Sequence, residues 1–204
     1  MIDPSITPAA FAIFIITISI SILSFKNPGR YARLMLHPYS FFRLKGLYTP
    51  LSSGFIHADA GHLVLNMLTF YFFAFGLESL IGSWNFLVIY LSTLILSDIS
   101  TLIKQRNNPD YRCLGASGAI SGVLFSYILI LPTTKIYLLF LPIGIPAPLF
   151  AALYVIYGIH AARKGRDNIN HEAHLWGALS GFLITLALFP GLWQSFLQKI
   201  SNIF

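Results

Sequence analysis

The chain has 204 residues, of which 56% are hydrophobic and 10% charged, and its formal net charge is +6. A soluble domain carries roughly 25% charged residues, so this composition, with a mean hydropathy of +0.72, excludes one and predicts an integral membrane protein. The Lys and Arg residues are scattered among predicted loops and form no stripe, which favours lipid headgroups over nucleic acid as their partner.

An apolar stretch near the start of the chain predicts a membrane-spanning helix over 7–24. This stretch is too long for a signal-peptide core, and Asp3 stands where a signal peptide has basic residues, so we expect a retained span. The next segment, 25–61, mixes aromatic and basic residues in FFRLKGLYTP. That mixture predicts a first loop lying at the membrane interface.

Hydropathy predicts five further spans, near 62–82, 84–103, 114–132, 144–161 and 172–191. All six are expected to be helices, because backbone polar groups in lipid must be satisfied within their own segment. Three prolines argue against a continuous helix across 135–148, and the tail WQSFLQKISNIF predicts a short interfacial helix. The predicted fold is all-α, with residues 1–204 forming one polytopic membrane domain, a bundle of six transmembrane helices.

Polar residues gather at the N-terminal ends of the second, fourth and sixth spans. The second opens with HLVLN, which places His62 and Asn66 four residues apart on one helix face. The fourth opens with LGASGAISG, which contains Ser117, and the sixth opens with HEAHLWGALSG, which contains His174. Alternate helices of a six-span chain run the same way, so we expect these clusters at similar depth beneath one face of the membrane.

Small residues predict that the fourth and sixth spans pack closely. Gly118 and Gly122 share a face of the fourth span, and Gly177 and Gly181 share a face of the sixth with His174. Contact between these faces would bring the Ser117 hydroxyl within hydrogen-bond reach of the His174 imidazole. A serine nucleophile needs this geometry from its general base.

Hydrolysis through a serine nucleophile also needs donors aimed at the developing oxyanion. His62 and Asn66 can supply them, together with the backbone N–H of Ser117 in the first turn of its helix. Neither nearby carboxylate is placed to orient the base, since Glu172 points to another face and Asp98 lies within the third span. A Ser–His dyad therefore fits these residues better than a triad.

At these residues the chain resembles the rhomboid family of intramembrane serine proteases, over the whole six-helix core. The matching motifs are H-x-x-x-N from His62 to Asn66, G-x-S-G from Gly115 to Gly118, and A-H-x-x-G-x-x-x-G from Ala173 to Gly181. The resemblance implies a cofactor-free endopeptidase that cleaves transmembrane segments of other proteins. It assigns Ser117 as nucleophile, His174 as base, His62 and Asn66 as oxyanion donors, and supporting positions to His57, Gly115, Gly118, Gly177 and Gly181.

Two features depart from the family pattern. Many rhomboids carry an aromatic residue four positions after the nucleophile, where it packs on the catalytic imidazole, and Ser121 stands here instead. The Trp-Arg pair that often marks the first loop is missing, with Lys45 and Gly46 near that place. We therefore expect other residues to hold the imidazole and to anchor the loop.

Two other functions stay open. The same bundle fits an inactive rhomboid-like protein that binds membrane helices, although such proteins usually lack the serine, the histidine or both. A zinc protease would use His57, His62, His171 and His174, but the pattern H-E-x-x-H spaces its histidines four residues apart, whereas HEAH spaces them three apart. We interpret His171 and Glu172 as interfacial residues.

The distribution of basic residues bears on orientation. Eleven of the thirteen Lys and Arg residues lie in predicted loops one, three and five, so the positive-inside rule puts the active-site face in the cytoplasm. Bacterial rhomboids resembling this chain generally open to the outside. We expect that orientation, because several of these charges lie in the first loop and can act as snorkelling anchors. The resemblance implies a multi-pass protein of a bacterial plasma membrane, and the oligomeric state stays open.

Overall fold

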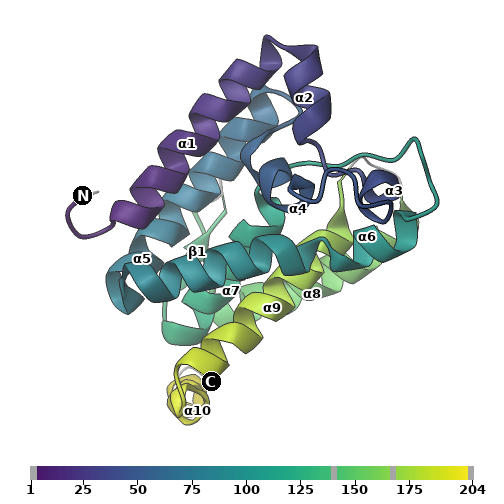
Figure 1. The fold of residues 1–204 in the computed structure, drawn as a ribbon. Helices are drawn as coiled ribbons and strands as arrows, with labels where there is room; N and C mark the ends of the chain where they lie inside the picture. The colour runs from purple at the N-terminus through teal and green to yellow at the C-terminus, as the bar shows by residue number, and fades with distance from the viewer. Residues whose placement is uncertain (1–3, 139–141, 166–168, 202–204) are drawn as a thin grey trace.

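The computed structural model describes residues 4–138, 142–165 and 169–201 of the chain. Within these ranges the protein is mostly helical, with one small two-stranded sheet (Figure 1). The fold is therefore not strictly all-α as predicted. The longer helices are α1 (Pro8–Phe25), α5 (Ala60–Ser97), α7 (Ser117–Ile130), α8 (Ala147–Lys164), α9 (His171–Leu188) and α10 (Leu192–Ser201).

Helix α1 lies along the first part of α5 and is held there by a buried carboxylate (Figure 1). The Glu78 side chain, fully buried on α5, accepts hydrogen bonds from the backbone N–H groups of Ala9 and Ala10 at 3.0 and 2.6 Å. The Ser83 hydroxyl donates a third bond to it at 2.6 Å. The first N–H groups of a helix lack intrahelical acceptors. The Thr7 side chain, at the N-cap position of α1, does not accept from them, and Glu78 accepts instead.

The second and third predicted spans form one long helix with a sharp break. Within α5, Gly82 has φ 77° and ψ 159°, and the two parts of the helix run in different directions on either side of it (Figure 1). A left-handed φ is strained for any residue with a Cβ, so glycine is needed at this corner. The predicted third span, 84–103, is further divided at Asp98, after which α6 (Ile99–Gln105) continues.

Helix α7 lies in the centre of the bundle, and nearly all of its residues are buried. It begins at Ser117 rather than at 114, because Gly115 has φ +117° and the preceding residues follow a loop. Its 14 residues rise about 21 Å, less than the roughly 30 Å of a bilayer core. This short helix is covered by its neighbours α5, α8 and α9.

The number of membrane crossings is not established by helix length and composition. Among the described residues, Pro8–Phe25 and Ala60–Gln105 are long and apolar enough to cross, and α9 with α10 qualify only as a pair bent by 113°. Helix α7 is shorter, and α8 ends in charged residues. The six-span count predicted from the sequence thus stays a prediction.

Residues 135–137 and 144–146 form two paired strands, which corrects the predicted start of the fifth span at 144. Strands β1 (Lys135–Tyr137) and β2 (Gly144–Pro146) pair antiparallel, with Ile136 opposite Ile145. The prolines act as predicted in preventing a continuous helix, and α8 starts only at Ala147. Residues 139–141 of this segment lie outside the described part of the chain.

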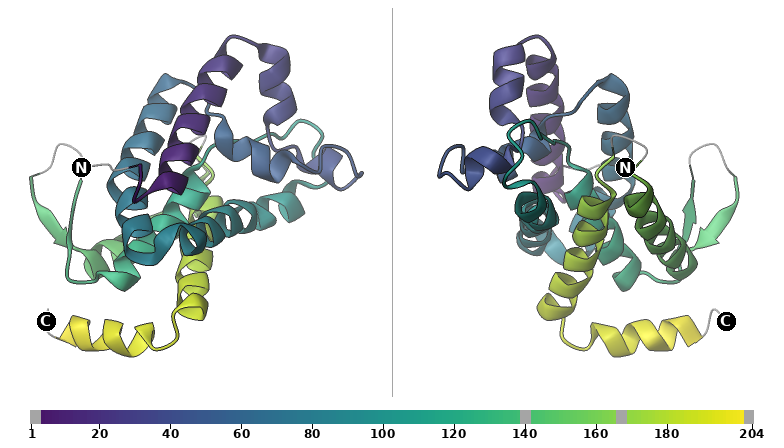
Figure 2. Two further views of the ribbon diagram at one scale, coloured as in Figure 1. Left: turned by 60° about the vertical axis from the view of Figure 1, so that its left-hand side comes forward. Right: turned by 90° about the vertical axis from the view of Figure 1, so that its right-hand side faces the viewer.

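The predicted sixth span, 172–191, ends early. Helix α9 stops at Leu188, and Gly191, with φ +91°, makes the turn into α10. Helix α10 then runs across the end of the bundle, far from the N-terminal end of α9 (Figure 2). The predicted tail helix is confirmed up to Ser201, while its place at a membrane interface stays a prediction.

The first loop is built from short helices and is anchored to the segment before α7. It contains α2 (Pro28–Leu34), α3 (Pro38–Phe41), α4 (Thr49–Ser52) and the 3-10 helix η1 (Ser53–Phe55). Leu36 and Cys113 exchange two backbone hydrogen bonds of 2.9 and 3.1 Å. The His37 imidazole forms a hydrogen bond of 2.8 Å with the Pro109 carbonyl oxygen. These contacts anchor the first loop, which lacks the Trp-Arg pair.

Candidate active site

The N-terminal ends of α5, α7 and α9 meet at one cavity of about 1260 Å³. Its wall includes His62 and Asn66 from α5, Ser117 from α7 and His174 from α9. The structure thus brings together the three polar clusters of the second, fourth and sixth predicted spans. The alternating direction of the helices predicts this arrangement. The other parts of the wall come from the first loop, α6, the segment before α7, α8 and the segment before α9.

The Ser117 hydroxyl and the His174 imidazole are in hydrogen-bond contact, with Oγ 2.7 Å from Nε2. Ser117 is the first residue of α7, and His174 lies in the first turn of α9. Helix α9 starts there because the Asn170 side chain accepts the Ala173 N–H at 3.1 Å, while its amide donates to Thr101 at 2.7 Å. Helix capping therefore fixes the level of the imidazole opposite the hydroxyl.

Close contact between α7 and α9 depends on glycine. A Cβ on Gly177 would lie 2.0 Å from the Gly118 carbonyl oxygen, and one on Gly181 would lie 2.3 Å from the Gly122 carbonyl oxygen. A Cβ on Gly118 would meet the Ser97 hydroxyl oxygen at 2.3 Å. The predicted small-residue faces do pack on each other, and this packing carries Ser117 to His174.

The side chains of His62 and Ser117 lie beside Gly115 in the wall of the same cavity. An added Cβ on Gly115 would lie 3.2 Å from His62 Nε2 and 3.9 Å from Ser117 Oγ, so the missing side chain of Gly115 lets the two approach. The Ala58 N–H donates to His62 Nδ1 at 3.5 Å. In a neutral imidazole this leaves the ring proton on Nε2, the atom that faces the cavity beside Ser117.

Asn66 lies one turn further along α5 and is almost fully buried. One N–H of its amide donates to the His62 carbonyl at 3.0 Å, which leaves a second N–H on the same nitrogen. Because Asn66 lines the cavity with Ser117, this amide belongs to the same group of candidate donors. The backbone N–H of Ser117 joins them, since the first residue of a helix has no intrahelical acceptor.

His57 supports the His62 ring from behind. It is fully buried, its ring meets that of His62 edge to face at 5.0 Å between centroids, and its Nδ1 lies 3.0 Å from the Ser21 hydroxyl oxygen. Ser21 donates to the Phe55 carbonyl, so His57 Nδ1–H is the donor to Ser21. Burial, with a smaller contribution from His62, lowers the pKa of His57 to about 3, so this ring is neutral.

His171 lies in the wall of the candidate site, and its interpretation as an interfacial residue stays a prediction. Its ring is buried, lines the cavity and meets the His174 ring edge to face at 6.1 Å between centroids. The ring of Tyr157, from α8, packs on the other side of His171 at 5.8 Å. The i, i+3 spacing of HEAH was the available signal for this contact. Glu172 behaves as expected of a surface residue and pairs with Lys104.

Ser121 bonds to a neighbouring helix where the family often has an aromatic side chain. Its hydroxyl donates to the Ser117 carbonyl at 2.8 Å and lies 2.7 Å from the phenol oxygen of Tyr154, on α8. Tyr154 lines the cavity as well. Sequence reasoning did not find Tyr154, because nothing in the local pattern of α8 distinguishes it from its other aromatic residues.

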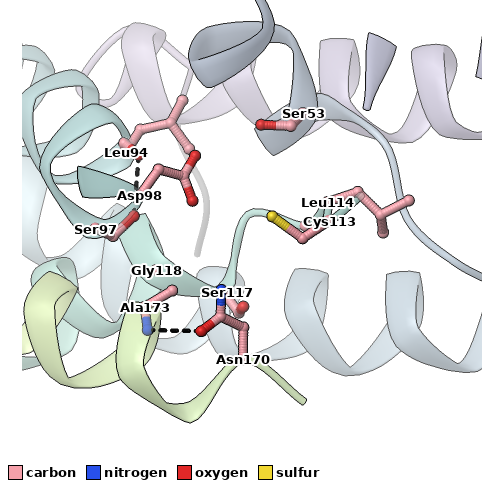
Figure 3. Close-up of a pocket in the computed structure, with 11 residues that line it drawn as sticks. Ser53, Leu94, Ser97, Asp98, Cys113, Leu114, Ser117, Gly118, Asn170 and Ala173 are labelled. Atoms are coloured by element: carbon pink, nitrogen blue, oxygen red, sulfur yellow. Dashed lines mark hydrogen bonds between the residues drawn. The ribbon is translucent and has the colours of Figure 1, made fainter. Parts of the chain in front are cut away.

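A second, smaller cavity adjoins Ser117 and is lined by both polar and apolar residues (Figure 3). Figure 3 shows Asp98 and Ser53 across from Cys113 and Asn170 in its wall. Burial, with a further contribution from the Asp98 carboxyl, raises the pKa of the Cys113 thiol to about 12. Cys113 is therefore an unactivated thiol beside the site.

The four histidines considered as zinc ligands form two separate pairs, His57 with His62 and His171 with His174. Among residues 4–138, 142–165 and 169–201, no three His, Cys, Asp or Glu side chains are grouped so that they could hold a metal ion. The geometry of these donors does not fit the zinc alternative.

A helical bundle with a cavity at the N-terminal ends of three helices, and a Ser–His contact in the wall of that cavity, defines a class of membrane-embedded protein. The chain belongs to the rhomboid family, because its residues 45–191 match the Rhomboid domain. Rhomboids are multi-pass membrane proteins with a protease-like function on transmembrane substrates, and some members are inactive.

Three relatives illustrate the similarity. RHOMBOID-like protein 12, mitochondrial, of Arabidopsis thaliana is 30% identical over 152 residues, which cover 67% of this chain and 45% of the relative. Presenilin-associated rhomboid-like protein A, mitochondrial, of Danio rerio is 34% identical over 131 residues, 63% of this chain and 34% of the relative. "Putative rhomboid protease YdcA" of Bacillus subtilis is 30% identical over 140 residues, 68% of this chain and 64% of the relative.

The chain thus spans between about one third and two thirds of the length of these relatives. Two of the three are mitochondrial proteins and one is bacterial. The relatives therefore support a multi-pass membrane protein, and they do not support the predicted plasma membrane or bacterial source.

Proposed function

We propose that the protein is an intramembrane serine endopeptidase that hydrolyses peptide bonds in or near transmembrane segments of other proteins. The observation that carries this proposal is the 2.7 Å contact between Ser117 Oγ and His174 Nε2 in the wall of an open cavity. An activated serine needs a general base within this distance.

In the proposed reaction, Ser117 Oγ attacks the scissile carbonyl carbon while His174 Nε2 accepts the hydroxyl proton. His174 then gives this proton to the leaving amine, so that the C–N bond breaks and an acyl ester on Ser117 remains. Water attacks the ester carbonyl, and His174 again moves the proton, first from the water and then to Ser117 Oγ. The cycle needs no cofactor.

The negative charge on the carbonyl oxygen would be stabilised by His62, Asn66 and the Ser117 backbone N–H. The arrangement that favours these roles is the His62 Nε2–H beside Gly115 and the Asn66 amide in the same wall. Loss of one such donor typically lowers the rate by about 10²–10³-fold.

The substrate enters this site as an extended segment. A peptide group inside a helix has its carbonyl hydrogen-bonded and its carbon shielded by neighbouring turns, so the scissile bond must first unwind. We expect substrates with Gly, Pro or small residues near the ends of their spans. We also propose that the helical segments cross the membrane six times as one domain, with short α7 shielded from lipid by its neighbours.

The proposal is tested by reconstituting the chain in liposomes with a fluorescent transmembrane reporter that carries a glycine near one end of its span. Wild type is expected to cleave the reporter. Ser117→Ala and His174→Ala are expected to remove cleavage, while expression and thermal stability stay close to wild type. His160→Ala, which changes an exposed histidine on α8, is the matched control and should cleave normally.

Two results would lead to another function. Cleavage by either Ser117→Ala or His174→Ala would exclude the dyad, and loss of wild-type cleavage with a chelator would favour a metal. Binding of transmembrane helices without cleavage by wild type would favour an inactive rhomboid-like protein.

A further inference from the structure

Tyr154 links α8 to the turn of α7 that carries Ser117. The Ser121 hydroxyl has a single proton, which it donates to the Ser117 carbonyl at 2.8 Å. The phenol of Tyr154 is therefore the donor in its 2.7 Å contact with the Ser121 oxygen. The result is a chain of hydrogen bonds from Tyr154 through Ser121 to the backbone of Ser117.

Other side chains of α8 pack beside Tyr154 against the apolar core, namely Phe150, Ala151 and Val155. The buried residues of α8 are Ala147, near its start, and Gly158, which meets Leu175 of α9. Between them, the Tyr154 ring packs on Phe125 of α7 at 5.4 Å between centroids. Tyr154 thus adds a hydrogen bond to the apolar packing between α8 and the helix of the candidate nucleophile.

The ring also forms part of the cavity wall. From α8, the cavity is lined by Tyr154, Ala161 and Ala162, so Tyr154 is the one bulky side chain that this helix contributes. Ser121 lies one turn, about 6 Å, further along α7 than Ser117. The phenol therefore fills space one turn beyond the reacting hydroxyl, on the side of the cavity toward α8.

We propose that Tyr154 determines which substrate side chains fit beside Ser117, with its ring as the wall and its bond to Ser121 holding that ring in place. This assignment rests on the proposed protease function. In that reaction, the residue on the N-terminal side of the scissile bond stays attached to Ser117, so its side chain is held nearest to this wall. The phenol then favours small side chains over large ones.

The test compares two liposome reporters that differ only in this residue, Ala in one and Phe in the other. The measured quantity is the ratio of their kcat/KM values. A single methylene in a pocket changes such a ratio by about 10- to 200-fold. We expect Tyr154→Ala to shift the ratio toward the Phe reporter by at least about tenfold. Tyr154→Phe keeps the ring without the bond to Ser121, and its shift should be smaller.

Two further variants distinguish loss of the Tyr154 ring from the cavity wall from a general disturbance of α8 packing. Phe150→Ala truncates a neighbouring ring on the same helix that does not line the cavity, and should keep the wild-type ratio. The double variant S121Y/Y154A supplies the ring from α7 instead, and should return the ratio toward wild type. If Tyr154→Ala does not accumulate, Tyr154→Leu takes its place under the same criteria.

An unchanged ratio, within about twofold, in the truncated Tyr154 variant would overturn the assignment, as would an equal shift in Phe150→Ala. These outcomes differ from failure of the proposed function. If wild type cleaves neither reporter, the protease proposal fails, whereas if wild type cleaves them and only the ratio is insensitive to Tyr154, this assignment alone fails.

Discussion

The backbones of Gly177 and Gly118 are in direct contact, so that a Cβ on Gly177 would lie 2.0 Å from the Gly118 carbonyl oxygen. Gly118 follows Ser117 in the chain, and Gly177 lies three residues after His174. The distance between the hydroxyl and the imidazole is therefore set by how closely these two backbones approach.

Gly177→Ala is expected to force α7 and α9 apart. Alanine in place of glycine normally stabilises a helix by roughly 1 kcal/mol through its higher helix propensity. A lower melting temperature would therefore show that the clash between the two helices costs more than this gain. We expect both a lower melting temperature and at least about tenfold slower reporter cleavage. Gly29→Ala in α2, where an added Cβ meets no atom closer than 3.5 Å, is the matched control. Normal cleavage by Gly177→Ala would contradict this account of the contact.

Glu78 should be a major contributor to the stability of α1. Its buried carboxylate accepts three hydrogen bonds, and removal leaves the Ala9 and Ala10 N–H groups without these acceptors. Because buried bonds to a charged group contribute about 1.5–3 kcal/mol each, Glu78→Ala should lower the unfolding free energy by at least about 3 kcal/mol. Glu172→Ala, which breaks a partly exposed ion pair, should change it by at most about 1 kcal/mol. Equal effects of the two substitutions in denaturant titrations would be inconsistent with the cap.

Stability should depend on pH through His57. Its folded pKa of about 3 lies below the ordinary value of 6.5, so between these values the unfolded chain binds a proton that the folded chain does not. The stability contributed by neutral His57 is complete above pH 6.5 and is lost as pH falls toward 3, by up to about 1.4 kcal/mol per pH unit. His57→Asn, which keeps a donor for Ser21, should flatten the melting-temperature profile in this range. His160→Asn is the control, and an unchanged profile in His57→Asn would refute the assignment.

Membrane orientation is open to a direct test. We expect the cavity face to lie on the outer side, although most Lys and Arg residues lie in the loops of that face. Single cysteines at Arg43 in the first loop and Gly165 after α8, in a Cys113→Ser background, should react with an impermeant maleimide in intact bacterial cells made to express the chain. Reaction of both positions only after permeabilisation would put the cavity face in the cytoplasm, in agreement with the positive-inside rule.

The neighbourhood of the candidate site could be predicted because its signals are local and periodic. His62 and Asn66 lie on one helix face, and Gly177 and Gly181 mark a smooth one, whatever surrounds them. Helix direction alternates along the chain, which suffices to place distant clusters at one level. The structure brings Ser117 and His174 together for these reasons, and their catalytic roles stay predictions.

Other features depend on tertiary contacts that no local pattern encodes. Tyr154 meets Ser121 because α8 lies against α7 at that turn, and the His171 ring contacts Tyr157 from α8 as well as His174. The sequence over 135–146 is as apolar as a helical span, so hydropathy does not distinguish strand β2 from the helix that follows it. The break at Gly82 was predicted as a loop between spans, yet a single left-handed residue makes the turn.

The most direct test of the account is covalent labelling of Ser117. We expect a fluorophosphonate probe to modify wild type in liposomes, with peptide mapping by mass spectrometry placing the adduct on Ser117 and on none of the other serines. His174→Ala should lower the labelling rate by at least about a hundredfold, because the hydroxyl then lacks its base. Equal labelling of wild type and His174→Ala, or an adduct on another serine, would contradict the claim that the imidazole activates this hydroxyl.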